Sequence, residues 1–302
     1  IDFICHFVEE KVEELGVHEI RIPEMHNIVE GALEKVNPIV AKSYRDYRNY
    51  KQDFVQMLDE VYKKSQSIMY IGDKENSNTD SALVSTKRSL IFNELNKELY
   101  QKVFLTVEEL QAIREGYIYI HDMSARRDTM NCCLFDVKSV LTGGFEMGNL
   151  WYNEPKTLDT AFDVIGDIVL SAASQQYGGF TVPSVDEILE PYAKRSHENH
   201  LNKYRSLGLS EEVAQEIAWK DLEKEMEQGF QGWEYKFNSV SSSRGDYPFI
   251  TMTSGTNISE YGKLVTKTML EVRAGGQGKP GHKKPVLFPK IVFLYDENLH
   301  GP

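Results

Sequence analysis

The stretch TMNCCLFD, residues 129–136, places two of the three cysteines of this chain, Cys132 and Cys133, side by side. Its apolar character predicts a strand, and successive side chains of a strand point to opposite faces. Only one of the two thiols can therefore face a site, while the other packs behind it. A disulfide between them is not expected, because adjacent extended residues lack the geometry of that bond. A second interpretation stays open, in which both are small buried hydrophobic residues.

Strand-like segments alternate with long helical segments on both sides of this stretch. Strands are expected at 117–120, 129–137, 235–240, 248–254 and 286–295. Helices are expected at 87–101, 158–174, 183–194, 210–229 and 259–274, and a short helix is expected to begin after the N-cap residue Thr106. A polar, turn-rich loop is expected at 72–85. Alternation of this kind predicts an α/β domain with parallel strand pairing.

The first fifty residues predict helices only. Apolar residues recur at helical spacing up to Gly16, a second helix begins at Pro23, and a third follows Pro38. The third helix carries basic side chains near its expected end. These side chains are Arg45, Arg48 and Lys51. Basic residues in the last turns of a helix complement its dipole without any further role, so both a structural and a ligand-binding interpretation remain.

Composition limits the class of protein. Acidic residues (46) outnumber basic ones (34) in 302 residues, a net charge of -12, which argues against a general nucleic-acid binder. Three cysteines make no disulfide framework and indicate a reducing interior. With neither a signal peptide nor a membrane-length apolar stretch, we expect a cytoplasmic protein with no membrane contact. Both ends of the chain look cut, so we expect a fragment of a longer protein.

Several motifs occur in a specific order along the chain. They are EGYIYIHDM at 115–123, the cysteine stretch, QQYGGFTVPS at 175–184, SSSRGDYPF at 241–249 and FPKIVF at 288–293. From about residue 60 to the end, this set resembles the large subunit of the anaerobic (class III, glycyl-radical) ribonucleoside-triphosphate reductases. Residues 28–33 and 40–48 resemble the second half of an ATP-cone, a small regulatory domain of that family.

The resemblance implies a fold. Residues 1–52 would be the C-terminal part of an ATP-cone, and residues 53–302 the N-terminal half of a ten-stranded α/β barrel. The opening strands of the cone, which carry much of its nucleotide contact in the family, are missing from this sequence.

The resemblance also implies an oxidoreductase that converts ribonucleoside triphosphates to 2′-deoxyribonucleoside triphosphates under anaerobic conditions. In that family a glycyl radical generates a thiyl radical, which takes the 3′-hydrogen. A second thiol, on the first barrel strand, donates hydrogen as the 2′-hydroxyl leaves as water. The match assigns this catalytic thiol to Cys132, with Cys133 as the alternative and Asn131 beside them.

Cofactors and partners follow from the same resemblance. An S-adenosylmethionine iron–sulfur activase would install the glycyl radical, and zinc would be held by C-terminal cysteines. Both sites would lie beyond residue 302, so we expect no metal site here and no turnover by this chain alone. A homodimer regulated by ATP, dATP and other deoxynucleotides is implied, whereas the electron donor, formate or a thioredoxin-like protein, stays open.

Three further groups are candidate nucleotide contacts. Effector contacts are expected at Gln176, Tyr177, Gly178 and Gly179, where one glycine takes a positive φ or lets backbone approach a ligand. Substrate contacts are expected at Ser242, Ser243 and Arg244, since arginine suits phosphate. The ATP-cone contacts would be Arg45, Arg48 and Lys51. Each group also fits an ordinary turn or helix end.

Smaller features leave alternatives open. His121 and Asp122 form either an acid–base pair or a capped turn. The basic, glycine-rich segment 273–284 is either a flexible surface loop or one that orders on ligand docking. A glycyl-radical enzyme of the pyruvate formate-lyase type and a non-catalytic ATP-cone regulator remain as alternative functions.

Overall fold

The computed structural model describes residues 1–71, 82–127, 129–242 and 245–301. The chain divides into two compact units, Ile1–Gln66 and Ser67–Pro302. Each is described by itself. The expected domain boundary between residues 52 and 53 remains a prediction. No helix among the described residues is long and apolar enough to cross a membrane.

The first unit consists of helices, as expected. They are α1 (Asp2–Leu15), α2 (Ile22–Val36) and the first part of α3 (Pro38–Ile71). Gly16 ends α1 in the left-handed conformation (φ 59°), which glycine adopts without a steric penalty. A proline lies in the first turn of α2, where its missing N–H is not needed. The third helix is longer than its sequence pattern predicts.

The second unit begins with α4 (Val84–Phe104), α5 (Val107–Arg114) and the short 3₁₀ helix η1 (Met123–Ala125). Thr106 caps α5 as expected, since its hydroxyl accepts the Glu109 N–H at 3.2 Å and Glu109 accepts the Thr106 N–H at 2.7 Å. The prediction of a strand at 117–120 is wrong. The N–H of Tyr117 donates to Ala112 O at 2.9 Å, so this segment closes the end of α5 and pairs with no strand.

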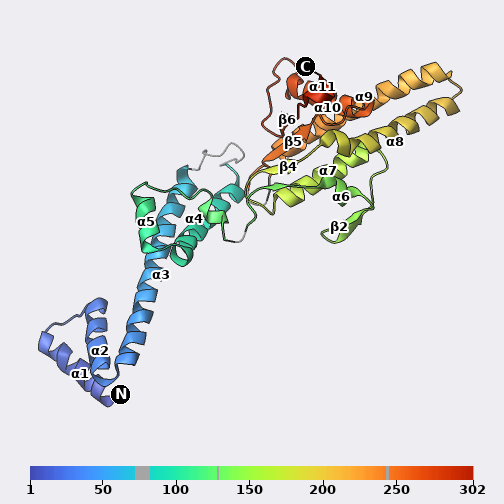
Figure 1. Cartoon of the computed structure of the whole chain (residues 1–302). Helices are drawn as coiled ribbons and strands as arrows, with labels where there is room; N and C mark the ends of the chain where they lie inside the picture. The colour runs from blue at the N-terminus through green and yellow to red at the C-terminus, as the bar shows by residue number, and fades with distance from the viewer. Residues whose placement is uncertain (72–81, 128, 243–244, 302) are drawn as a thin grey trace. The chain divides into compact units, whose positions relative to one another are not determined.

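The second unit contains a four-stranded parallel sheet, which confirms the α/β class with parallel pairing (Figure 1). Its strand order is β1 (Cys133–Leu134), β4 (Phe180–Val182), β5 (Ile250–Ser254) and β6 (Lys290–Phe293). The strand expected at 129–137 shrinks to two residues, although a parallel bridge between Met130 and Gln176 extends the pairing. A hairpin of β2 (Phe145–Met147) and β3 (Leu150–Tyr152) was not expected from the sequence.

Helices connect these strands. They are α6 (Val137–Leu141), α7 (Leu158–Ala173), α8 (Val185–Ser206), α9 (Glu211–Ser239), α10 (Glu260–Gly275) and α11 (Glu297–His300). Helices α8 and α9 run beside each other as a long hairpin (Figure 1). The strand expected at 235–240 is wrong, because α9 continues to Ser239. Phe230, Trp233 and Phe237 are buried at helical spacing, and this burial outweighs the β-propensity of the segment.

The two faces of the sheet differ in what covers them. Phe180 and Ile250 lie in register and are fully buried in one core with residues of α7, α8, α9 and α10. Thr181 and Thr251, one residue later, point to the other face and are only half-buried. Leu134, in register with Thr181, is 76% exposed. We call this second surface the open face of the sheet.

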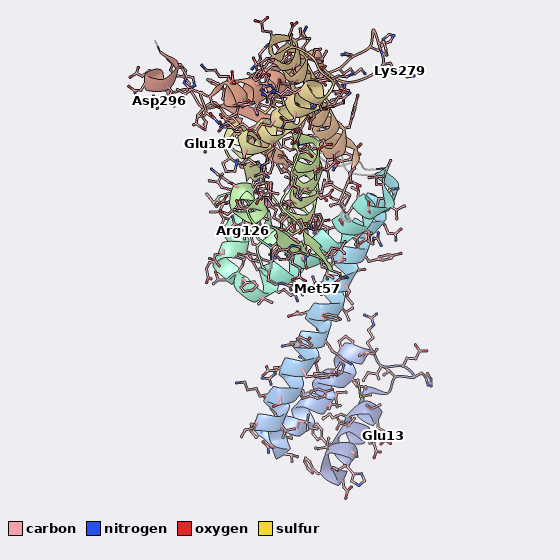
Figure 2. All side chains as sticks on the ribbon, turned by 90° about the vertical axis from the view of Figure 1, so that its right-hand side faces the viewer. Glu13, Met57, Arg126, Glu187, Lys279 and Asp296 are labelled. Atoms are coloured by element: carbon pink, nitrogen blue, oxygen red, sulfur yellow. The ribbon has the colours of Figure 1, made fainter. Side chains whose placement is uncertain are left out.

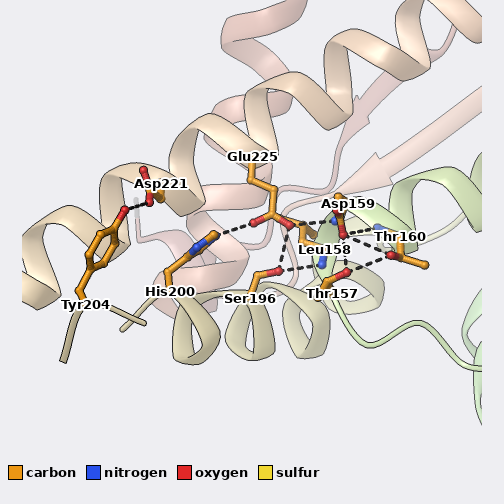
Figure 3. Close-up of polar contacts among 9 residues, drawn as sticks. All are labelled: Thr157, Leu158, Asp159, Thr160, Ser196, His200, Tyr204, Asp221 and Glu225. Carbon is orange, nitrogen blue, oxygen red and sulfur yellow. Dashed lines mark hydrogen bonds and ion pairs between the residues drawn. The ribbon is translucent and has the colours of Figure 1, made fainter. Parts of the chain in front are cut away.

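A polar network ties the start of α7 to α8 and α9 (Figure 3). Glu225 accepts the Asp159 N–H and the Ser196 hydroxyl, each at 2.9 Å, and lies 2.9 Å from His200 Nε2. Ser196 in turn accepts the Leu158 N–H at 2.8 Å. One carboxylate and one hydroxyl therefore satisfy N–H groups that have no partner within the first turn of α7.

The basic loop after α10 is anchored at its base. Gln277 and Lys284 exchange two backbone hydrogen bonds of 2.8 Å, and Lys279 lies exposed in the loop beyond them (Figure 2). Arg273 donates to Val286 O at 2.6 Å and forms an ion pair with Glu234 at 3.0 Å. Only the tip of the segment therefore has the character of a surface loop.

Candidate functional site

The two adjacent cysteines lie in different surroundings, as strand alternation predicts. Cys133 is in register with Phe180 and packs against the core, and its Sγ lies 2.9 Å from Gln176 Oε1. Burial raises the pKa of the Cys133 thiol, and the neighbouring Cys132 adds to the effect. Cys133 is therefore held as a protonated thiol that donates to Gln176.

Cys132 points the other way and is exposed. Its Sγ accepts the Gly179 N–H at 3.3 Å and lies 3.7 Å from Asn131 Oδ1. It is the thiol that a molecule on the open face can reach. One lone pair of the Cys132 sulfur accepts the Gly179 N–H, and the thiol hydrogen of Cys132 is directed toward Asn131 Oδ1.

The turn at 175–179 is bound directly to the cysteine stretch. The N–H of Tyr177 donates to Met130 O at 3.0 Å, and the N–H of Gly178 donates to Asn131 O at 2.6 Å. A Cβ atom on Gly178 would lie 2.7 Å from Cys132 Sγ, which real Cβ atoms do not do. The backbone of Gly178 therefore lies close to the cysteine stretch, and its approach to a ligand remains a prediction. The expectation of a positive φ at Gly178 or Gly179 is wrong.

Gln176 is the most buried polar residue of this turn, at 4% exposure. Its Nε2 donates to Gly179 O at 2.9 Å and to Gly178 O at 3.3 Å. Most of its side chain is thus engaged with the protein, which leaves little of it for a nucleotide.

A small pocket combines two groups that the sequence analysis treats as separate. It is lined by Gln176, Tyr177 and Gly178 on one side and by Ser242 on the other, with Asp246, Tyr247 and Phe249 among its remaining walls. Ser242 itself closes a turn, since its N–H donates to Asp246 O at 2.8 Å and its hydroxyl to Asp246 Oδ1 at 2.9 Å. Ser243 and Arg244 lie outside the described residues.

The open face carries polar side chains that the sequence analysis did not single out. Thr181 and Thr251 are in register with each other, and Lys290 is in register with Thr251. The Lys290 ammonium lies 3.9 Å from the centre of the Phe249 ring. The alternation of Phe180, Thr181 and Val182 was the signal that could have identified this surface.

Asn131 connects the cysteine stretch to the preceding turn. Its Nδ2 donates to Asp122 Oδ2 at 3.4 Å, and His121 Nδ1 lies 2.5 Å from the same oxygen. Asp122 has a positive φ of 52°, which is uncommon for a residue other than glycine. The structure thus brings the 121–122 pair to Asn131, beside the exposed thiol.

In the first unit, the candidate cone residues face acidic partners. Arg45 pairs with Glu30 and with Glu34, the latter at 2.7 Å, and Arg48 pairs with Glu30 at 2.9 Å. Lys51 is exposed, with its ammonium 5.3 Å from the centre of the Tyr47 ring. A phosphate would have to compete with the two carboxylates for both guanidinium groups.

The described residues contain no group of three or more His, Cys, Asp or Glu side chains placed to hold a metal ion.

Comparison with known proteins gives one family. The family model for anaerobic ribonucleoside-triphosphate reductase matches residues 75–301. Among curated proteins of that name, the one from Haemophilus influenzae is 31% identical over 310 residues, with 99% of this chain and 43% of the relative covered. The one from Enterobacteria phage T4 is 32% identical over 228 residues, covering 75% of this chain and 37% of the relative.

The relative from Escherichia coli is 29% identical, with 94% of this chain and 40% of the relative covered. The chain therefore spans well under half the length of these relatives. Solved structures of the anaerobic ribonucleotide reductase from Thermotoga maritima include one with dATP in its specificity site. That structure matches with a TM-score of 0.45 and 16% sequence identity, and the match covers 75% of this chain and 40% of the reductase chain.

Proposed function

The chain belongs to the anaerobic ribonucleoside-triphosphate reductase family, and from this premise we propose that the complete protein reduces ribonucleoside triphosphates to 2′-deoxyribonucleoside triphosphates. The observation that carries the proposal is the position of the two thiols. Cys132 is exposed on the open face, while Cys133 is packed against the core. A hydrogen donor to a substrate must be reachable, and Cys132 meets that requirement.

In this proposal the 2′-hydroxyl takes up a proton and leaves as water, and Cys132 Sγ then gives a hydrogen atom to the C2′ radical of the ribose. The thiyl radical left on Cys132 is reduced back to the thiol. The two electrons that the net reduction consumes come from an external donor, formate or a thioredoxin-like protein. Asn131 Oδ1, 3.7 Å from the sulfur, orients the S–H bond. Cys133 stays protonated behind the strand and supports the position of Cys132.

The same face suits a polar, anionic substrate. Thr181 and Thr251 offer hydroxyl groups, and Lys290 offers a positive charge in register with them. The substrate contacts at Ser242, Ser243 and Arg244, and the effector contacts at Gln176, Tyr177, Gly178 and Gly179, remain proposals. These proposals are supported by the small pocket that the turn at 175–179 and Ser242 line together.

We further propose the finer architecture that the family implies. The parallel sheet would be part of a ten-stranded barrel whose interior is the open face. The helices of the first unit would be part of an ATP-cone, in which ATP or dATP competes with Glu30 for Arg45 and Arg48. The complete protein would act as a cytoplasmic homodimer.

The radical chemistry is also a proposal for the complete protein. A glycyl radical, installed by an S-adenosylmethionine iron–sulfur activase, would supply the unpaired electron, and zinc would be bound by cysteines outside this chain. The residues of this chain contribute the accessible thiol, its orientation and the polar face.

The test uses the complete, activated protein with Cys132→Ala. Deoxynucleotide formation should fall to background, while the glycyl radical signal in electron paramagnetic resonance should form normally, because the donor acts after the radical is made. Cys133→Ala is the matched control and should retain most of the activity. Full activity in Cys132→Ala, or loss only in Cys133→Ala, would contradict the assignment.

A further inference from the structure

A single peptide unit lies between Gln176 and the exposed thiol. The carbonyl oxygen of Gly178 accepts from Gln176 Nε2 at 3.3 Å, and the N–H of Gly179 donates to Cys132 Sγ at 3.3 Å. These two groups belong to the same planar trans peptide, with the C=O and N–H on opposite edges. A rotation of this peptide that moves the Gly178 carbonyl therefore also moves the Gly179 N–H.

The orientation of the Gln176 amide is determined by its neighbours. Two carbonyl oxygens, of Gly178 and Gly179, can only accept, so both face Nε2. The remaining oxygen, Oε1, then accepts the thiol hydrogen of Cys133 at 2.9 Å. The reversed amide would place Oε1 against two carbonyl oxygens, which is repulsive.

Burial makes this arrangement rigid. Gln176 is 4% exposed, and little water is available to replace any of these contacts. The turn is also held from the other side, because the N–H of Cys133 donates to Gly179 O at 3.1 Å. Gln176 therefore contacts both halves of the site, the buried thiol directly and the exposed thiol through one peptide.

We propose that Gln176 is a positioning residue that orients the Gly179 N–H toward Cys132. In this role it acts on the exposed thiol and not on the substrate. Through the peptide that joins Gly178 to Gly179, it determines which lone pair of the Cys132 sulfur is occupied and where its hydrogen points. A role in turnover rests on the proposed function, whereas the orientation of the peptide does not.

The test measures the orientation of the Gly178–Gly179 peptide and the turnover in the complete protein carrying Gln176→Met. This substitution keeps the length of the side chain and removes the amide. Hydrogen exchange followed by mass spectrometry should show a loss of protection of about tenfold at Gly179, because its hydrogen bond to Cys132 loses the support of Gln176. In activated enzyme, kcat should fall at least as much, with KM within about twofold, since no substrate contact is removed.

Two variants complete the design. Gln176→Leu also removes both donors and should behave like Gln176→Met. It provides the test if the methionine variant does not fold. Gln175→Met alters the exposed neighbour and should change neither readout. Unchanged exchange at Gly179 in whichever of the two Gln176 variants folds would overturn the proposal. Lost protection with a normal kcat would overturn the positioning role, while a wild-type protein without reductase activity would overturn the proposed function alone.

Discussion

Gly178 lies so close to Asn131 that a Cβ atom on it would stand 2.8 Å from the Asn131 carbonyl oxygen and 2.4 Å from Oδ1. The side chain could move away, but the backbone oxygen is held by the Gly178 N–H itself. We expect Gly178→Ala to reduce the free energy of unfolding by about 1–3 kcal/mol. Urea denaturation measures this change.

The neighbouring glycine is the matched control. A Cβ atom on Gly179 would be 3.7 Å from its nearest neighbour, Phe249, which is ordinary contact. Neither residue has a positive φ, so backbone strain affects neither variant. Gly179→Ala should cost clearly less than Gly178→Ala, and equal costs would contradict the steric argument.

The reactivity of Cys133 should depend on pH in a defined direction. Burial raises its pKa, so alkylation by iodoacetamide should have a higher pH midpoint in the folded protein than in urea, where cysteine titrates at about 8.5. An acid with a raised folded pKa stabilises the fold below the unfolded pKa, and this stabilisation is lost as the pH rises through the folded pKa. Peptide mass spectrometry reads the midpoint, and a folded midpoint at or below that in urea would refute the prediction.

Glu225 should be more important for stability than its charge suggests. Glu225→Ala removes the acceptor of the Asp159 N–H and the Ser196 hydroxyl at the start of α7. We expect a loss of about 1–3 kcal/mol in the free energy of unfolding. Glu216→Ala, which removes only an exposed pair with Lys220 at 2.6 Å, should change it by less than about 0.5 kcal/mol. Similar losses in both variants would show that the network at α7 contributes nothing special.

Arg273 is the other position with a large expected effect. Its partner Glu234 has a side chain only 5% exposed, so Arg273→Met leaves a buried carboxylate without its charge partner. Removal of one member of a buried pair costs about 3–5 kcal/mol. Thermal unfolding of Arg273→Met should reveal this loss, whereas Lys279→Met in the exposed loop should leave the transition nearly unchanged. An unfolding midpoint in Arg273→Met as high as in Lys279→Met would show that the ion pair of Arg273 with Glu234 does not stabilise the base of the loop.

Local patterns in the sequence predicted several elements correctly. Helical periodicity and caps located α5, α7 and α10, because an N-cap residue or a breaker marks their ends within a few residues. Strand alternation predicted that Cys132 and Cys133 have different environments, because the period of a strand is a local property of the backbone. The order of the motifs identified the family before any comparison.

Long-range contacts decided the rest. The β-rich segments at 117–120 and 235–240 are not strands, because one closes the end of α5 and the other buries its aromatic residues along α9. Strand β4 was hidden in a segment that could also be a turn, and only its pairing with β1 and β5 makes it a strand.

The site shows the same division. The residue types of Cys132, Asn131, Gln176 and Gly178 are in the sequence, and so is the expectation of a thiol facing a site. That Gln176 is buried and bound to Cys133, and that Gly178 is crowded by Asn131, depends on segments 43 or more residues apart being adjacent. Such contacts arise from packing of the whole sheet against its helices, and no local pattern of side chains specifies them.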